Sequence, residues 1–143
     1  MEPEYVPELF PTMAEQERPV TRPKYPELDR EMLVKVVDHA LSAENWRQTV
    51  WFMNNAETAC GTAMCIAGFA AIEFAGWKPI YDRGMKSAVW CENETGYSHP
   101  IFAVARDFLG LTKDEADDLF YSGHRADEVR RITEAILGGE YRS

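Results

Sequence analysis

Residues 60–71 read CGTAMCIAGFAA and open the most apolar segment of this 143-residue chain. Between Ala63 and Ala75 the only charged residue is Glu73, so a helix formed here is apolar on nearly every side. Such a helix must be buried, because no face of it is suited to water. The segment therefore predicts a central helix over residues 62–75, around which the rest of the fold is built.

Both ends of this predicted helix carry residues that commonly begin or end helices. Thr62 is expected to be the N-cap, its hydroxyl accepting from the amide of Cys65, while Gly61 allows the tight turn before it. Gly76 is expected to close the helix. Within it, Gly68 is expected to let a neighbouring element approach the backbone closely.

Apolar residues at helical spacing predict further helices on both sides of the central one. They are expected over about 28–43, in a short piece of 44–55, over about 99–109, after Thr112 and over about 127–137. Ser98 or His99 is expected to cap the helix over 99–109. Thr112 and Glu115 have the spacing of a capping box.

Residues 77–92 favour a β-hairpin. They read WKPIY and then KSAVWC, with Asp82, Arg83 and Gly84 between the two runs. Together the patterns predict a mainly α (α+β) fold: a helical domain of about five to six helices around the buried central helix (62–75), with this one β-hairpin.

The first 26 residues differ from the rest of the chain because six of its eight prolines lie there, with glutamates between them. Such a segment cannot sustain a helix, so we expect an irregular Pro-rich N-terminal arm over 1–26 and a single globular helical domain over 27–143. The arm has more apolar side chains than a linker needs, and we expect it to dock in part on the domain. These side chains are Tyr5, Val6, Leu9, Phe10 and Tyr25.

Composition excludes several classes of partner. The formal net charge of −9 and the pI of about 4.8 repel a nucleic-acid backbone. The longest apolar run is shorter than the roughly 20 residues that cross a bilayer. The N-terminal MEPEYVPELF lacks the basic and apolar regions of a signal peptide. We therefore expect a cytoplasmic protein with reduced thiols, no cofactor, and neither nucleic acid nor membrane as partner.

Three hypotheses compete for Cys60 and Cys65. In the first, one of them is a nucleophile whose pKa is lowered by the start of the helix, and His99 is its base. The side chains available to orient the imidazole or to donate to an oxyanion are Asn54, Asn55 and Gln48.

The string at 60–65 resembles the papain-like and related cysteine peptidases, whose nucleophile also opens a central helix within a CGxC or CGxxC-type pattern. The resemblance implies a hydrolase centred on Cys60 or Cys65 with His99. Two features depart from that family: an extra residue separates the cysteines here, and His99 precedes a proline at a helix start, whereas the family's histidine lies on a strand.

The second hypothesis is a small structural zinc site, since four nitrogen and sulfur ligands complete a tetrahedral centre. Its ligands would be Cys60, Cys65, Cys91 and His99. In the third hypothesis the cysteines are small buried residues of the core. Packing is also the expected role of Trp46, Trp51, Trp77 and Trp90, although tryptophans near the CGT segment could line a pocket.

Several blocks of the chain are similar to a group of small, functionally uncharacterised proteins of actinobacteria and especially of their phages. The shared elements are Trp46, Gln48, the CGTxxCIAG box at 60–68, the AGW at 75–77 and the LGL…EA…LF block at 109–120. The likeness spans roughly residues 45–137, and Phe69 stands where many of the group have tryptophan.

The group lends no known activity, substrate or catalytic residue. What the resemblance implies is a setting: a small non-structural factor, made during infection in the host cytoplasm, that acts by binding a host or phage protein. A protein-binding module is therefore the leading expectation, with the cysteine hydrolase and the zinc site as alternatives.

Overall fold

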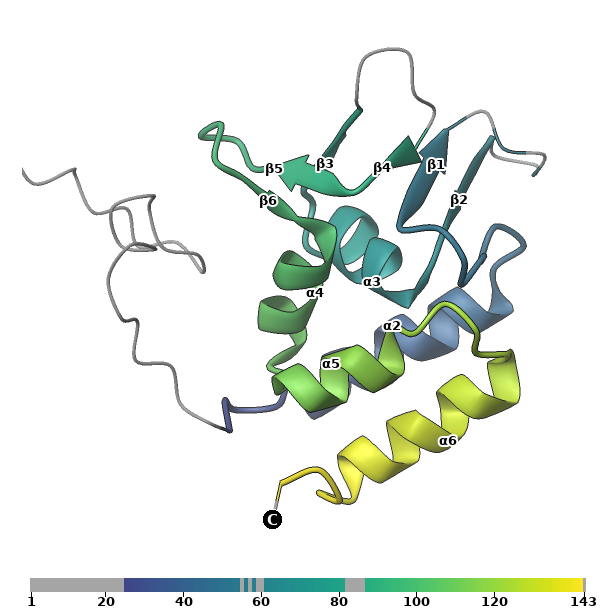
Figure 1. Ribbon diagram of the computed structural model, residues 1–143, viewed down its shortest axis with the longest axis vertical. Coiled ribbons are helices and arrows are strands. Elements are labelled where there is room, and N and C mark those ends of the chain that lie inside the picture. Colours follow the sequence, from purple (N-terminus) through teal and green to yellow (C-terminus); the bar gives the residue numbers. More distant parts are fainter. Residues whose placement is uncertain (1–24, 55, 57, 59–60, 82–86, 143) are drawn as a thin grey trace, which may run out of the picture.

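The computed structural model describes residues 25–54, 56, 58, 61–81 and 87–142. The strands gather at one end and helices α2, α5 and α6 at the other, with α3 between them (Figure 1). The elements are α2 (Arg30–Ser42), β1 (Phe52–Asn54), β2 (Thr62–Met64), α3 (Ile66–Gly68), the π-helical η1 (Phe69–Phe74), β3 (Lys78–Ile80), β4 (Ser87–Ala88), β5 (Trp90–Glu92), β6 (Ser98–Pro100), α4 (Ile101–Leu109), α5 (Lys113–Leu119) and α6 (Ala126–Leu137).

The prediction of a mainly helical domain with one β-hairpin is wrong. The described residues form an α+β fold in which six strands make two three-stranded antiparallel sheets, ordered β2-β1-β4 and β3-β5-β6. The pairing expected within 77–92 exists as β3 with β5, but β4 pairs with β1 and β5 also pairs with β6. Strands of two or three residues are too short for an alternating pattern to reveal them.

Residues 44–54, the described part of the segment 44–55, do not form the predicted short helix, and Phe52–Asn54 are instead the middle strand of the first sheet. Nearby, Trp46 makes an isolated bridge to Met64 of β2. The backbone partners of this segment come from residues distant in sequence, and such tertiary pairing overrides a weak local helical spacing.

The central helix is present but begins at Ile66, four residues later than predicted. Thr62 lies in β2, where its hydroxyl oxygen accepts from the side-chain amide of Asn45 at 3.2 Å, so it is not the N-cap. Cys65 takes that position without a side-chain capping bond. Gly61 has the positive φ of 78° that favours glycine, and it precedes the strand rather than the helix.

The second half of this helix, η1, has a wider turn than an α-helix. The amide of Ala75 donates to the carbonyl of Ala70, five residues back, at 2.8 Å. Gly76 has a φ of 82° and closes the helix as predicted. Residues 66–71 are all buried, so the prediction of an apolar helix at the centre of the fold is confirmed.

Helix boundaries that depend on local capping chemistry agree well with the sequence. The Asp29 carboxylate caps α2 by accepting from the amide of Met32 at 3.1 Å. Thr112 and Glu115 form the predicted capping box of α5, with bonds of 3.0 and 2.8 Å. Gly110 ends α4 in the left-handed conformation.

One expected cap is wrong. Ser98 and His99 do not begin the helix predicted over 99–109, because both lie in β6, where the backbone pairs with β5. Pro100 is the N-cap residue, and the ring suits that position because the amide that proline lacks needs no partner there.

The predicted arm over 1–26 lies outside the described residues except for Tyr25 and Pro26. Its last carbonyl, that of Pro26, accepts from the guanidinium of Arg142, which also donates to the carbonyl of Gly110 at 2.8 Å. The described ends of the chain therefore meet beside the start of α5. The boundary between arm and domain stays a prediction.

The same guanidinium holds a fully buried carboxylate. Glu115 accepts from two nitrogens of Arg142, both at 2.9 Å, and from the backbone amide of Thr112. Burial by itself raises the pKa of Glu115, but these hydrogen bonds and the charge of Arg142 hold it below its ordinary value. This pair fixes the C-terminal residues onto α5.

Gly68 is a packing glycine, as predicted. A Cβ atom built on it would overlap the carbonyl oxygen of Trp51 and would lie 2.6 Å from the Cβ of Met64. The backbone of the segment leading into β1 therefore rests directly on the backbone of the central helix. No larger residue fits without moving one of them.

Replacing Gly68 by alanine should lower the free energy of unfolding by about 1–3 kcal/mol or more, because the overlap involves backbone that cannot rotate away. Gly138→Ala is the matched control, since Gly138 ends α6 with a φ of −79° and its nearest neighbour would be 3.4 Å away. Urea unfolding of both variants measures the difference. Equal midpoints for the two would contradict the packing role.

Candidate functional site

Gln48 lies where the first sheet, the central helix and α5 meet, and all four of its hydrogen-bonding positions are used. Its Oε1 accepts from the indole nitrogen of Trp46 at 3.1 Å and from the amide of Ile66 at 3.3 Å. Its Nε2 donates to the carbonyls of Leu119 and Tyr121 at 3.0 and 3.1 Å. Only 7% of the residue is exposed, so these bonds form largely out of water.

These contacts connect three of the sequence blocks singled out above. Gln48 joins its neighbour Trp46, the first residue of α3 in the CGTxxCIAG box and the end of α5 in the LF block. Both N–H groups of the Gln48 amide are engaged, which leaves none to donate to an oxyanion. These three blocks therefore meet in space through one structural side chain.

Beside Gln48 the surface is hollowed into a cleft of about 430 Å³ between the segment before β1, the start of α3, and helices α4 and α5. We call it the aromatic cleft. The residues that line it include four with aromatic rings, together with one thiol and one carboxylate: Trp51, Phe102, Phe120, Tyr121, Cys65 and Asp117.

The rings of the aromatic cleft pack against one another edge to face. Trp51 and Phe102 have centroids 6.0 Å apart at 88°, and Phe102 and Phe120 have centroids 5.6 Å apart at 86°. Both arrangements are favourable for aromatic pairs and fix the walls. Tyr121 is 60% exposed at the rim, and Asp117 adds a carboxylate there. The cleft therefore combines rigid aromatic walls with polar lining residues, which include Gln48, Thr49 and Ser122.

Sequence reasoning named only Trp51 of these rings as a residue that might line a pocket. Phe102 lies in α4, whereas Phe120 and Tyr121 follow the end of α5, and local sequence patterns say nothing about which neighbours these residues meet. Their gathering depends on the Gln48 bonds to the end of α5, which no local signal reveals.

Cys65 lies in the wall of the aromatic cleft but is only 2% exposed. Burial raises the pKa of its thiol to about 11, although backbone hydrogen bonds from Gly68 and Ala67 act in the opposite direction. Burial also raises the pKa of Cys91 to about 12. Both sulfurs are therefore protonated near neutral pH, and a thiol is a much weaker nucleophile than a thiolate.

The structure brings Cys91 and His99 together but gives Cys65 a different setting. Cys91 and His99 are direct partners across β5 and β6, and the Cys91 thiol lies 3.5 Å from the His99 carbonyl oxygen. The His99 ring packs edge-on against Trp77, with centroids 6.1 Å apart. Within the described ranges no three His, Cys, Asp or Glu side chains are placed to hold a metal ion. Cys60 lies outside the described residues.

Asn54 lies at the exposed end of β1, opposite Thr62. Cys65 follows β2 at the other end, level with Trp51, so about three residues or 10 Å of strand separate the two positions. Asn54 is therefore poorly placed to assist chemistry at Cys65.

Comparisons with known proteins gave no matching family model, no matching curated protein and no matching solved structure. In the part of the chain that the structure describes, no helix is long and apolar enough to cross a membrane.

Replacing Gln48 by leucine keeps the volume of the side chain but leaves its four partners without their hydrogen bonds. Each buried polar group left unsatisfied costs about 1–3 kcal/mol, so we expect a loss of several kcal/mol in the free energy of unfolding. The neighbouring exposed Thr49→Val serves as control. Urea unfolding that gives the same midpoint for Gln48→Leu and the wild type would refute the connecting role.

Cys65 and Cys91 should react slowly with iodoacetamide at pH 8 in the folded protein and readily once it is unfolded in urea. The reason is their burial and their raised pKa values. Peptide mass spectrometry of timed samples reads each cysteine separately. Rapid modification of Cys65 in the folded state would favour the hydrolase hypothesis instead.

The same raised pKa values predict that the free energy of unfolding falls as the pH rises above about 9. Unfolded thiols lose their protons near pH 9, whereas the folded ones keep them until about pH 11 and 12. The unfolded state therefore binds fewer protons above pH 9, and the contribution of these thiols to stability is lost progressively as the pH rises through that window. Between pH 9 and 11 the free energy of unfolding of the Cys65→Ala variant should therefore fall less than that of the wild type.

Proposed function

We propose that this protein is a non-enzymatic binding module that receives an apolar or aromatic side chain of a partner protein in the aromatic cleft. The observation that carries the proposal is the cleft itself: about 430 Å³ with walls of interlocked rings and a tyrosine 60% exposed at its rim. Concave sites that combine aromatic side chains with precisely placed polar groups are a common form of binding site.

Rigid aromatic walls suit this task. Binding loses affinity when side chains must be immobilised, and Trp51 and Phe102 are already fixed by their edge-to-face contact. Tyr121 offers a large apolar surface and a hydroxyl that can reach a partner's polar group. Tyrosine and tryptophan are enriched among the residues that dominate binding energy for this reason.

The negative net charge of the chain indicates which kind of partner surface it would attract. A net charge of −9 attracts positively charged surfaces over several ångströms and raises their association rate at low salt. Asp117, at the edge of the cleft, is already paired with Lys113 at 2.7 Å, so the preference for a basic partner rests on the net charge of the chain. We therefore propose a partner that presents an apolar or aromatic residue flanked by lysine or arginine.

The biological setting is proposed from the resemblance alone. If the chain belongs with the actinobacterial phage proteins that it resembles, the partner is a host or phage protein and the encounter takes place in the host cytoplasm. The cleft supports binding whichever of the two supplies the partner.

One observation favours a second candidate, a cysteine hydrolase, because Cys65 lies in the wall of the same cleft. That candidate requires His99 to serve as base, and the raised pKa of Cys65 counts against an activated sulfur. The zinc alternative depends on Cys60, whose position the structure does not describe.

Peptides selected from a random display library on the purified protein should share an aromatic or large apolar residue next to basic ones. Tyr121→Ser should weaken the selected peptides by at least about tenfold, because it removes an exposed anchor of the rim. Trp90→Ser is the control, since Trp90 is 49% exposed on the second sheet and lies outside the cleft. Isothermal titration measures both.

Equal weakening by Tyr121→Ser and Trp90→Ser would place binding elsewhere and contradict the proposal. Peptides that lack any aromatic or large apolar residue would do the same.

A further inference from the structure

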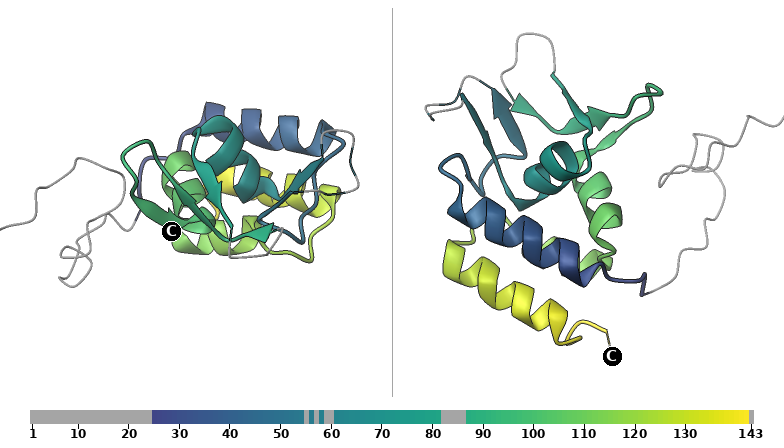
Figure 2. Two further views of the ribbon diagram at one scale, coloured as in Figure 1. Left: turned by 90° about the horizontal axis from the view of Figure 1, so that it is seen from above. Right: turned by 180° about the vertical axis from the view of Figure 1, so that it is seen from behind.

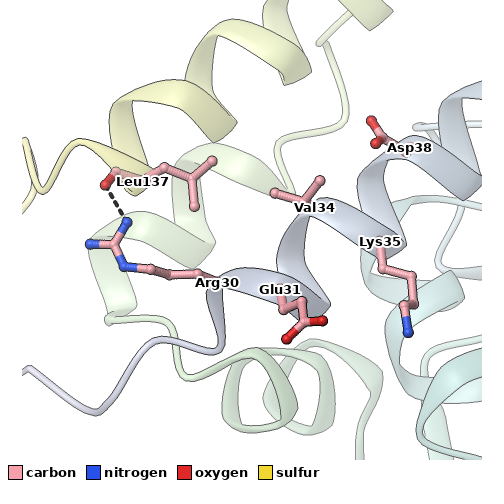
Figure 3. A pocket seen from close by; sticks show the side chains of 6 residues that line it. All are labelled: Arg30, Glu31, Val34, Lys35, Asp38 and Leu137. Carbon is pink, nitrogen blue, oxygen red and sulfur yellow. Dashed lines mark hydrogen bonds between the residues drawn. The ribbon is translucent and has the colours of Figure 1, made fainter.

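A second hollow, which we call the α2/α6 groove, is lined by five residues of α2 and by Leu137 of α6. These two helices run side by side at the end of the molecule opposite the strands (Figures 1 and 2). The groove has a volume of about 820 Å³ and opens widely to solvent. Figure 3 shows the six residues that line it: Arg30, Glu31, Val34, Lys35, Asp38 and Leu137.

The floor of the groove is apolar. Val34 is 39% exposed, although it is a large apolar side chain in the middle of a helix, and Leu137 of α6 is half-buried beside it. A smaller hollow of about 160 Å³ continues along the same two residues to Thr133. An exposed apolar strip rimmed by charges is a common form of contact surface.

The rim carries a small excess of positive charge. Asp38 is neutralised by Arg130, whose guanidinium nitrogen lies 2.9 Å from it. Of the remaining charges in the six lining residues, Arg30 and Lys35 are positive and Glu31 is negative, a net of +1, while Glu134 adds one negative charge beside the adjoining smaller hollow. Lys35 forms no ion pair with any other residue that the structure describes. A carboxylate of an occupant would therefore be favoured next to Lys35.

The N-terminal arm is attached at one end of this groove. Arg142 holds the carbonyl of Pro26, and four residues later Arg30 begins α2 and donates to the carbonyl of Leu137 at 2.6 Å. The 24 residues that precede the described structure are thus anchored within about one helical turn of the groove.

The arm has the length and the chemistry to fill the groove. From Arg30 to Asp38 the groove follows eight helical steps, about 12 Å, and an extended chain covers that distance with about four residues. Residues 5–10 read YVPELF, with four apolar side chains and Glu8, and the first 17 residues contain five glutamates and no lysine or arginine. A segment tethered this closely has an effective concentration in the millimolar range.

We infer that residues 5–10 of the chain's own N-terminal arm occupy the α2/α6 groove, with their apolar side chains on Val34 and Leu137 and Glu8 beside Lys35. The inference is independent of the proposed function. It concerns the α2/α6 groove, which the chain's own arm would cover, whereas the proposed function concerns the aromatic cleft and a partner protein. It gives the apolar residues of the arm a defined place to dock.

The test uses methyl NMR spectra of the full-length protein. Replacing Leu9 and Phe10 together by serine should shift the methyl signals of Val34 and Leu137, because ring and apolar neighbours leave them. Val20→Ser, in the same arm but outside residues 5–10, is the matched control and should leave both signals in place. Val89, 51% exposed beside the sheets, is the internal reference.

A converse variant, Val34→Asp, keeps the fold because its site is exposed, yet it should speed the hydrogen exchange of amides 5–10 by about tenfold by releasing the segment. Val89→Asp should not change that exchange. Unchanged Val34 and Leu137 methyl signals in the Leu9/Phe10 variant would overturn the inference. Shifts that depend on protein concentration would also overturn it, since they would assign the groove to the arm of a second copy.

Discussion

The four hydrogen bonds of Gln48 are the constraint on which the rest of the structure depends. Through them the start of the central helix, the indole of Trp46 and the end of α5 have one common partner. An amide side chain suits this position because it offers two acceptor and two donor positions at once, and here each has a partner. The aromatic cleft exists because these segments are held at this distance from one another.

How far the sequence predicts this fold depends on where each element finds its hydrogen bonds. The capping box of Thr112 and Glu115 involves residues three positions apart, and the sequence predicts it correctly. The strands pair residues far apart in the chain and are too short to show alternation, so only the region of β3 and β5 was expected. Thr62 looked like a helix cap because its partner in the strand cannot be seen locally.

The candidate site was harder to predict for a related reason. The two cysteines of the CGTAMCIAGFAA segment drew attention because the start of a helix can activate a thiol. That argument assumes exposure, and Cys65 is instead covered on nearly every side. What the segment contributes to the cleft is a closely packed wall, made possible by Gly68 beneath the carbonyl of Trp51. The three rings that complete the cleft come from distant segments that no local pattern connects.

The wide turn of η1 also governs how the helix is joined to the second sheet. A turn closed by a five-residue step contains one residue more than an α-helical turn of similar height, so the helix takes up additional chain without growing longer. The additional residue changes the direction in which the chain points when it reaches Trp77 after the helix. In this direction the indole of Trp77 contacts the ring of His99 on β6. Deleting one residue from η1 would tighten the turn to that of an α-helix. It would thereby rotate Trp77 away from His99.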